Sequence, residues 1–206
     1  MRTAPASFAV LAAGTASVVF GACAHGGDAP IANRSQPGPT SEVRAIDWQN
    51  RTYELTELGA VTVKDGHADF AISDDDQVAE AGAERGSYAV DRPLFADVDG
   101  DGIEDAVISS VLSTGGTGHF SEVRIYTMRA AKVIELGVIP GGDRGDGGIR
   151  RVTLDGRAVI VERNVLAEGD GACCASTWQR ERWIWRSGQL VEDAAARGPL
   201  QPVPAN

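Results

Sequence analysis

The chain has 206 residues, a formal net charge of −10 at pH 7 and a sequence pI near 4.7. Its length suits a single folded domain. Its acidity makes it a poor partner for nucleic acid or for anionic lipid headgroups, and is compatible with cation binding and with solubility.

The first segment, residues 1–22, is predicted to be a lipoprotein signal peptide. Arg2 provides a short positive region, and residues 8–20 form a thirteen-residue stretch without a charge, which is too short to span a membrane as a helix. The stretch ends in Phe20-Gly21-Ala22-Cys23, which resembles a bacterial lipobox with phenylalanine in place of the usual leucine. The resemblance implies a diacylglycerol group on Cys23 and cleavage before it. The alternative is an ordinary signal peptide cleaved at the same point.

Residues 23–42 are rich in glycine, proline and polar side chains, so they are predicted to form a lipid-anchored flexible tether. Acyl chains on Cys23 would attach the protein to the membrane without a spanning helix. The domain would then lie on the extracytoplasmic side of the cell membrane, and Ala24 permits the outer membrane in a cell that has two. At the other end, residues 194–206 are predicted to be a disordered tail.

Residues 43–193 are predicted to form one domain that is mainly β. Apolar or alternating runs of strand length are separated by Gly and Asp turns, and no segment shows a sustained helical period with caps. The pattern predicts an antiparallel meander sheet or sandwich of roughly seven to ten strands, with long Gly-rich loops and little helix. The runs that carry this prediction are residues 46–55, 61–63, 68–72, 107–112, 123–128, 152–154, 157–162 and 178–190.

Three short segments are predicted to be hairpin turns. Lys64–His67 contains Asp-Gly, Asp155-Gly156 is a two-residue type I′ signal, and Ser187-Gly188 provides the third turn. Residues 73–87 are the strongest candidate for a helix, but Gly82 and the acidic start of the segment favour a loop.

The last run predicts a strand with two different faces. Trp183 and Trp185 share one face, which is predicted to be core. The opposite face is rich in arginine and is predicted to be solvated; it carries Trp178, Arg180, Arg182, Ile184 and Arg186.

The segment most informative about chemistry is Asp97–Asp105, with the sequence DVDGDGIED. Carboxylates stand at positions 1, 3, 5 and 9, glycine at position 6 and the carbonyl of Ile103 at position 7, which is the oxygen-ligand spacing of a calcium loop. Glycine permits the sharp reversal of a chain curled around an ion. The alternative is an Asp/Gly turn whose side chains bind their own backbone. We favour a bound cation because four carboxylates so close together repel one another strongly without one.

The flanks of this loop distinguish it from an EF-hand, which needs a glutamate at position 12 and helices on both sides. Position 12 is Ile108, and the surrounding sequence is β-rich. The stretch resembles the calcium hairpins of FG-GAP and VCBS repeats, known from integrin-α β-propellers, which carry D-x-D-x-D-G-x-x-D between two strands. It occurs once, so the hairpin is expected without the propeller. The resemblance implies a structural Ca²⁺ bound by the side chains of Asp97, Asp99, Asp101 and Asp105 and by the carbonyl of Ile103.

The chain as a whole is similar to small bacterial lipoproteins of uncharacterised function. These combine a DGDG loop, a Gly-Gly-Thr-Gly segment (here Gly115–Gly118), a cysteine pair and a C-terminal Arg/Trp strand. The resemblance implies a membrane-anchored, extracytoplasmic lipoprotein with one structural calcium site. Such a protein would serve as a binding or envelope-interaction module for an unidentified ligand or protein partner.

Cys173 and Cys174 are adjacent in the sequence. Neighbouring cysteines cannot form an ordinary loop-closing disulfide with each other, which leaves a vicinal disulfide, two reduced thiols or an intermolecular bridge. Two thiolates suit Cu(I) or zinc, although no nearby histidine or methionine completes a site. Thiol or soft-metal handling is therefore one alternative function.

The sequence contains no G-x-S-x-G elbow, H-E-x-x-H motif, Walker A loop or Rossmann glycine fingerprint. Carboxylates brought together by the fold could still cleave glycan or peptide, so a cell-envelope hydrolase is a second alternative. A deep pocket with converging acids would favour the hydrolase, and a shallow surface would favour a binding module.

Overall fold

The computed structural model describes residues 42–56, 58–71, 85–115, 118–171 and 173–204. The chain divides into two units, residues 1–37 and 38–206, and every described residue belongs to the second unit. The predicted signal peptide, Cys23 and most of the tether lie outside the described residues. Within the described ranges, no helix has both the length and the apolar character needed to cross a membrane.

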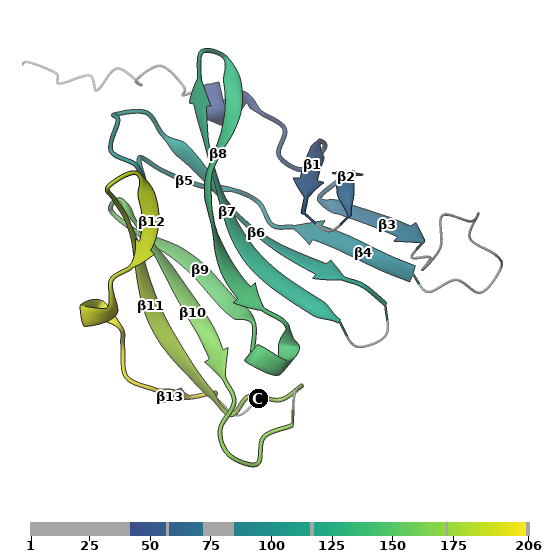
Figure 1. Cartoon of the computed structure of the whole chain (residues 1–206), viewed down its shortest axis with the longest axis vertical. Coiled ribbons are helices and arrows are strands. Elements are labelled where there is room, and N and C mark those ends of the chain that lie inside the picture. The colour runs from purple at the N-terminus through teal and green to yellow at the C-terminus, as the bar shows by residue number, and fades with distance from the viewer. Residues whose placement is uncertain (1–41, 57, 72–84, 116–117, 172, 205–206) are drawn as a thin grey trace, which may run out of the picture. The chain divides into compact units, whose positions relative to one another are not determined.

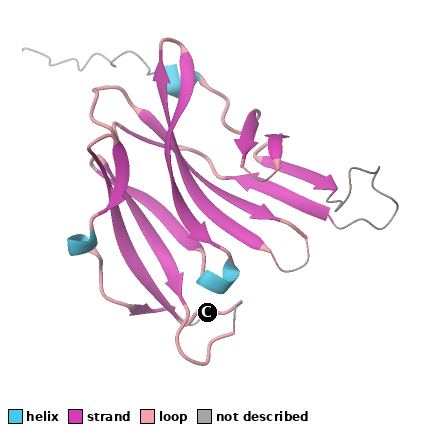
Figure 2. Cartoon of the chain, in the orientation of Figure 1, coloured by secondary structure: helices cyan, strands magenta, loops and turns pink. Residues whose placement is uncertain are grey.

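The prediction of a mainly β domain with antiparallel strands is confirmed (Figure 2). Three short 3₁₀ turns accompany the strands in the described ranges: η1 (Glu42–Ala45), η2 (Arg144–Asp146) and η3 (Ala194–Ala196). The strands are β1 (Thr52–Leu55), β2 (Gly59–Thr62), β3 (His67–Ala71), β4 (Arg85–Val90), β5 (Leu94–Ala96), β6 (Asp105–Ser113), β7 (His119–Arg129), β8 (Lys132–Gly142), β9 (Ile149–Asp155), β10 (Ala158–Val165), β11 (Thr177–Arg186), β12 (Gln189–Glu192) and β13 (Gln201–Pro202).

These strands form three antiparallel sheets (Figure 1). β1 and β2 form a two-stranded sheet. The six-stranded sheet has the order β3-β4-β6-β7-β8, with β5 paired to the first residues of β6. The C-terminal sheet has the order β12-β11-β10-β9, with β13 paired to β11. Successive hairpins within the two larger sheets give the predicted meander.

Two hydrophobic cores lie on opposite faces of the six-stranded sheet. The first joins this sheet to the N-terminal elements through Trp48, Tyr53 and Tyr88, among other buried residues. The second joins it to the C-terminal sheet through Val123 and Val159, among others. β6 contributes to both cores, because side chains alternate along a strand and nearly all of its first residues are apolar.

Two of the predicted hairpins join neighbouring strands of one sheet. The turn of one of them is of a different type from the one predicted. Ser187 and Gly188 both have positive φ, as in a type I′ turn, between β11 and β12. Asp155 instead pairs with Ala158, so the turn residues are Gly156 and Arg157. Of these two only Gly156 has positive φ, which indicates a type II′ turn and corrects the predicted type I′ turn.

The predicted turn at Lys64–His67 is present, because the two end residues form an isolated antiparallel bridge. The flanking strands nevertheless do not pair as a hairpin. β2 pairs with β1, whereas β3 pairs with β4 in the six-stranded sheet. The backbone N–H of Gly66 donates to the carbonyl of Gln49 at 2.8 Å, so the turn is fixed by the preceding loop instead.

The C-terminal segment corrects a second expectation. The predicted disordered tail is wrong for residues 194–204, which contain η3 and β13. Gly198 donates its N–H to the carbonyl of Arg180, and Val203 donates to that of Ser176, both at 2.8 Å. The segment is therefore held along the edge of β11. In the predicted helix-or-loop segment, residues 73–84 lie outside the described residues and residues 85–87 belong to β4.

Trp183 packs against the second core, as its predicted face requires. Glu181 lies on the same face of β11 and is buried. Its carboxylate accepts hydrogen bonds from Arg163 Nε at 2.7 Å and from Trp183 Nε1 at 3.0 Å. Burial alone would raise the pKa of Glu181, but these two partners lower it below its ordinary value of 4.5.

The Arg163–Glu181 pair predicts a specific acid sensitivity. A carboxylate with a lowered folded-state pKa stabilises the protein above its unfolded-state pKa, and this contribution is lost as pH falls through the folded-state value. Glu181→Gln is therefore expected to cost about 1–3 kcal/mol of unfolding free energy near pH 7. The difference from the wild type should shrink as pH falls below about 4.5. Urea unfolding across this range measures it, and a difference that stays constant would contradict the prediction.

Candidate functional site

The aspartate-rich loop joins two paired strands. β5 pairs antiparallel with β6, and Ala96 lies opposite Asp105, so residues 97–104 close a strand–loop–strand unit as predicted. Gly100 and Gly102 have φ values of +78° and +90°. Both residues adopt a backbone conformation that favours glycine, which explains the spacing of the glycines in the motif.

Three of the predicted carboxylates come together. One oxygen each from Asp97, Asp99 and Asp105 lies within 4.8 Å of the others, so this group could hold a metal ion. Asp101 is exposed and outside the group, and its Oδ1 accepts the N–H of Ile103 at 2.8 Å. Ligation by Asp101 and by the carbonyl of Ile103 stays a prediction.

The loop also forms the internal hydrogen bonds that the alternative interpretation requires. Asp97 accepts the N–H groups of Gly100 at 2.7 Å and of Gly102 at 3.3 Å. Asp99 Oδ1 accepts the N–H of Asp101 at 3.1 Å. These bonds shape the turn and hold the side chains of Asp97 and Asp99 toward the inside of the loop. The two interpretations are therefore compatible, because oxygens that accept N–H groups retain further lone pairs for a cation.

Asp105 is the buried member of the group, with no exposed surface. Its Oδ2 accepts the N–H groups of Val98 at 2.8 Å and of Asp99 at 3.3 Å. Its Oδ1 and the buried hydroxyl of neighbouring Thr127 form no hydrogen bond of normal geometry, although the hydroxyl is close enough to act on the carboxylate. Burial raises the pKa of Asp105, and the Thr127 hydroxyl and the two N–H groups only partly oppose it. A buried carboxylate oxygen without a partner is costly unless a cation or water completes it.

Two arginines from distant parts of the chain, one at the end of β7 and one in the turn between β9 and β10, reach this loop. Arg129 Nη2 forms an ion pair with Asp99 Oδ2 at 2.8 Å, and Arg157 Nε donates to the carbonyl of Asp97 at 3.1 Å. A Cβ on Gly100 would overlap the guanidinium of Arg157, so a larger residue there would displace the end of that side chain. Sequence reasoning missed both arginines because they follow the loop by tens of residues. The turn chemistry around them gives no signal of proximity.

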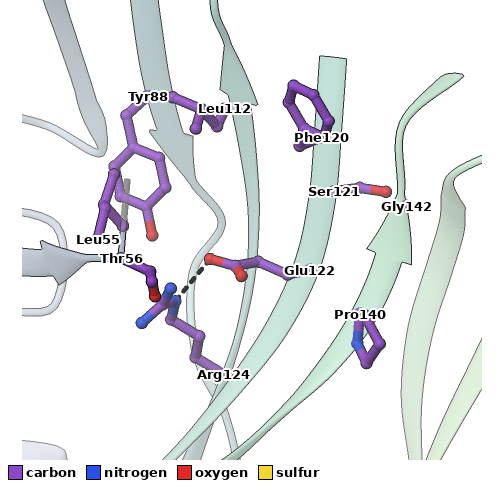
Figure 3. A pocket seen from close by; sticks show the side chains of 10 residues that line it. All are labelled: Leu55, Thr56, Tyr88, Leu112, Phe120, Ser121, Glu122, Arg124, Pro140 and Gly142. Atoms are coloured by element: carbon purple, nitrogen blue, oxygen red, sulfur yellow. Dashed lines mark hydrogen bonds and ion pairs between the residues drawn. The ribbon is translucent and has the colours of Figure 1, made fainter. Parts of the chain in front are cut away.

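A pocket of about 250 Å³ opens on the first-core side of the six-stranded sheet (Figure 3). Its walls are formed by both apolar and polar side chains, and a tyrosine hydroxyl and a carboxylate–guanidinium pair face one another inside it. The residues that line it are Leu55, Thr56, Tyr88, Leu112, Phe120, Ser121, Glu122, Arg124, Pro140 and Gly142. Sequence reasoning did not identify this pocket, because its residues come from five segments of the chain.

Arg124 is the charged centre of the pocket. Its Nε binds Glu122 Oε1 at 2.6 Å, and its Nη1 binds Glu135 Oε2 at 2.8 Å and the carbonyl of Glu54 at 3.2 Å. Burial opposes the charge on Arg124, but the ion pairs with the two glutamates more than offset burial, so its pKa is raised. The guanidinium thus joins β7 to β8 and to β1, and it stays charged in the protein.

The hydroxyl of Tyr88 is the unsatisfied group of the pocket. Tyr88 is 1% exposed, and its oxygen has no hydrogen-bond partner. Figure 3 shows this hydroxyl directed toward the space beside Arg124 and Glu122. Burial raises the pKa of Tyr88, and the Ser110 side chain and the charge of Arg124 only partly oppose it, so the phenol keeps its proton and can both donate and accept a hydrogen bond.

Cys173 and Cys174 form a vicinal disulfide, which is one of the three arrangements left open by the sequence. Both residues are exposed. The loop around them is fastened by Asp170, whose Oδ2 accepts the N–H groups of Ala167 and Ser176 at 2.8 Å. Bonded sulfurs provide no thiolate ligand, so the structure gives no support to soft-metal handling.

The sequence matches no protein-family model, and neither a curated protein nor a solved structure is similar to it.

Proposed function

We propose that this chain is a lipid-anchored, extracytoplasmic binding module that holds a small hydroxyl-rich ligand in the pocket beside Arg124. The observation that carries the proposal is the buried hydroxyl of Tyr88, which faces this pocket and forms no hydrogen bond of normal geometry in the protein, although the Ser110 side chain is close enough to act on its pKa. Buried polar groups are nearly always hydrogen-bonded, so an unpaired one that faces a pocket supports a partner from outside the protein, and a ligand hydroxyl would supply it. The lipobox-like sequence ending in Cys23 supports the membrane anchor.

The lining of the pocket supports a small ring that carries hydroxyl groups, such as a neutral sugar. Glu122 is an acceptor, and the phenol of Tyr88 can donate or accept. Leu112 and Phe120 provide an apolar wall for the less polar face of such a ring. The volume of about 250 Å³ is suited to one ring and not to a long polymer.

Binding is better supported than hydrolysis at this site. The two carboxylates beside the pocket, Glu122 and Glu135, both form ion pairs with Arg124. A glycoside hydrolase of the two-carboxylate type needs one protonated acid and one free carboxylate flanking the bond to be cleaved. A pair that is shared by one guanidinium can orient hydroxyl groups but is poorly placed to donate a proton.

In this proposal the aspartate loop binds Ca²⁺, which acts as a structural cofactor. The three grouped ligands are carboxylates, the donors preferred by hard cations. The unpaired Oδ1 of Asp105 gives this group an oxygen that the protein itself leaves unsatisfied. The ion would fix the connection between β5 and β6 and so support the sheet that carries the pocket.

Tyr88→Phe tests the ligand pocket. The variant removes a hydroxyl that forms no hydrogen bond of normal geometry in the protein, so the melting temperature is expected to stay within about 2 °C of the wild type. Affinity for a bound sugar should fall about tenfold, because one hydrogen bond to a buried group is lost. Calorimetric titration with a panel of neutral mono- and disaccharides measures both the choice of sugar and the loss.

Tyr53→Phe is the matched control, because its hydroxyl donates to the carbonyl of Trp48 at 2.6 Å and does not line the pocket. This variant should lose about 1 kcal/mol of unfolding free energy and keep the wild-type affinity. The proposal is contradicted if no sugar in the panel binds, or if Tyr88→Phe binds as tightly as the wild type.

A further inference from the structure

One face of the C-terminal sheet contributes to neither hydrophobic core and is bordered by the C-terminal segment, beside which Ile160 is buried. Val159 and Val161 of β10 point to the second core, so the alternate residues Ile160 and Glu162 lie on the opposite face. Directly paired residues share a face in an antiparallel sheet. The register therefore places Arg151, Arg180 and Arg182 on this outer face with them.

The charge of the outer face is opposite in sign to that of the chain. The face itself carries five arginines and two carboxylates, a net charge of +3, whereas the whole chain has a net charge of −10. In the segment that borders the face, Arg197 is paired with Glu192, and Asp193 is one further acid. The charged residues of the face are Arg150, Arg151, Asp155, Glu162, Arg180, Arg182 and Arg186.

Not all of these arginines are used within the protein. Arg150 binds Glu162 at 3.2 Å, and Arg182 forms an ion pair with Asp155. Arg151 and Arg180 are exposed and, among the described residues, form no hydrogen bond or ion pair with another side chain. Their guanidinium groups remain available to carboxylate, sulfate or phosphate groups, which arginine binds with two parallel hydrogen bonds.

A groove of about 560 Å³ crosses this face. One side is the sheet, with Trp178, Arg180 and Arg182, and the other is the C-terminal segment, with Pro199 and Gln201. That segment is fixed along the sheet, because the N–H of Gly198 donates to the carbonyl of Arg180. The walls of the groove are therefore held in place by hydrogen bonds between the sheet and the C-terminal segment.

Trp178 provides an aromatic wall. Its Nε1 donates to the carbonyl of Pro202 at 3.2 Å, and Arg150 lies 5.1 Å from the ring centroid. These contacts hold the indole in place while it lines the groove. An aromatic ring beside guanidinium groups suits a sugar residue that carries an acid, because the C–H face of the sugar packs on the ring while the acid binds arginine.

We propose that this groove binds an anionic polysaccharide of the cell envelope, with uronate, sulfate or phosphate groups on Arg180 and its neighbours and sugar rings on Trp178. This interaction is separate from the pocket beside Arg124. An anionic membrane surface is the other source of such charge. A groove with a fixed tryptophan favours a chain ligand, whereas membrane binding favours aromatic side chains free to insert between lipids.

The test measures binding of the purified protein to polygalacturonate and to heparin oligosaccharides by fluorescence anisotropy, at NaCl concentrations from about 25 to about 200 mM. Both polysaccharides are expected to bind, with affinity that falls steeply as salt rises, and neutral dextran should not bind. The double variant Arg151→Gln/Arg180→Gln should lower affinity about tenfold. Trp178→Ala should lower affinity at every salt concentration without reducing the salt dependence.

Arg85→Gln/Arg92→Gln is the matched control, because it makes the same change in net charge at exposed arginines outside this face. It should keep wild-type affinity, and thermal melts of all variants confirm that they fold. The proposal is overturned if the control loses as much affinity as the test variant, or if neither polysaccharide binds. It is also overturned if vesicles with about one third phosphatidylglycerol bind while both polysaccharides do not.

Discussion

Arg124→Leu is expected to lower the free energy of unfolding by about 3 kcal/mol and the melting temperature by roughly 6–12 °C. Removing the guanidinium leaves Glu122 and Glu135 close together without a counter-charge and leaves the carbonyl of Glu54 without its side-chain donor. Breaking a fully buried pair costs about 3–5 kcal/mol. The lower end of this energy range applies to Arg124→Leu, because the two glutamate side chains are 26% and 36% exposed and can reach water.

Urea unfolding measures this loss, and a triple variant provides its internal control. Arg124→Leu/Glu122→Gln/Glu135→Gln removes all three charges, so it should recover part of the stability lost in the single variant. The exposed substitution Arg85→Leu should change stability by less than about 0.5 kcal/mol. A triple variant as unstable as Arg124→Leu would show that the cost comes from packing and not from uncompensated charge.

Ca²⁺ at about 10 mM is expected to raise the melting temperature by roughly 3–10 °C over chelator-treated protein, with saturation. Calcium sites of extracellular modules have dissociation constants of about 10⁻⁴ to 10⁻³ M. At ten to one hundred times that concentration the bound ion adds about 1.4–2.7 kcal/mol of stability by mass action. Asp97→Asn should abolish the rise, since it removes one charge from the group of three carboxylates yet keeps an oxygen for the turn.

Asp91→Asn is the control for charge, because Asp91 is exposed and belongs to no carboxylate group. It should keep the full calcium response. Asp101→Asn tests whether Asp101, whose carboxylate lies outside the group of three, is a fourth ligand, since loss of a ligand would reduce the rise in melting temperature with calcium. Mg²⁺ should not reproduce the rise, because it demands a smaller octahedral site. An identical melt in calcium and in chelator would contradict the proposed ion.

The sequence was sufficient to predict the mainly β fold and the strand–loop–strand unit around Asp97. Both depend on local patterns, namely apolar runs between Gly and Asp turns and the spacing of carboxylates along nine residues. Turn chemistry predicted the hairpin at Ser187-Gly188, where both residues have positive φ. It missed the turn at Ala130-Ala131, whose residues also have positive φ but belong to a type that rarely adopts it.

The remaining features depend on contacts between distant segments. Arg124 meets the carbonyl of Glu54, seventy residues earlier, and no property of either local sequence indicates that contact. The pocket beside Tyr88 is likewise assembled from strands that pair through the fold. Residues 194–206 were predicted to be a disordered tail, but residues 198–203 form backbone hydrogen bonds with β11 and with Ser176, which lies far from them in the sequence.

The double burial of β6 has a consequence for how its pairing is specified. In a sheet with one wet face, a shift of one residue would expose the apolar side chains and is penalised for that reason. Ala106, Val107 and Ile108 are all apolar and all buried. A one-residue shift of β6 would therefore move these side chains to the other face of the sheet without exposing much apolar surface to water. The register of β6 is instead specified by polar residues of the strand. Asp105 accepts hydrogen bonds from the backbone of the preceding loop, and Ser110 donates to Glu122 on the paired strand. A shift of β6 by one residue would break both contacts, so they favour the observed register.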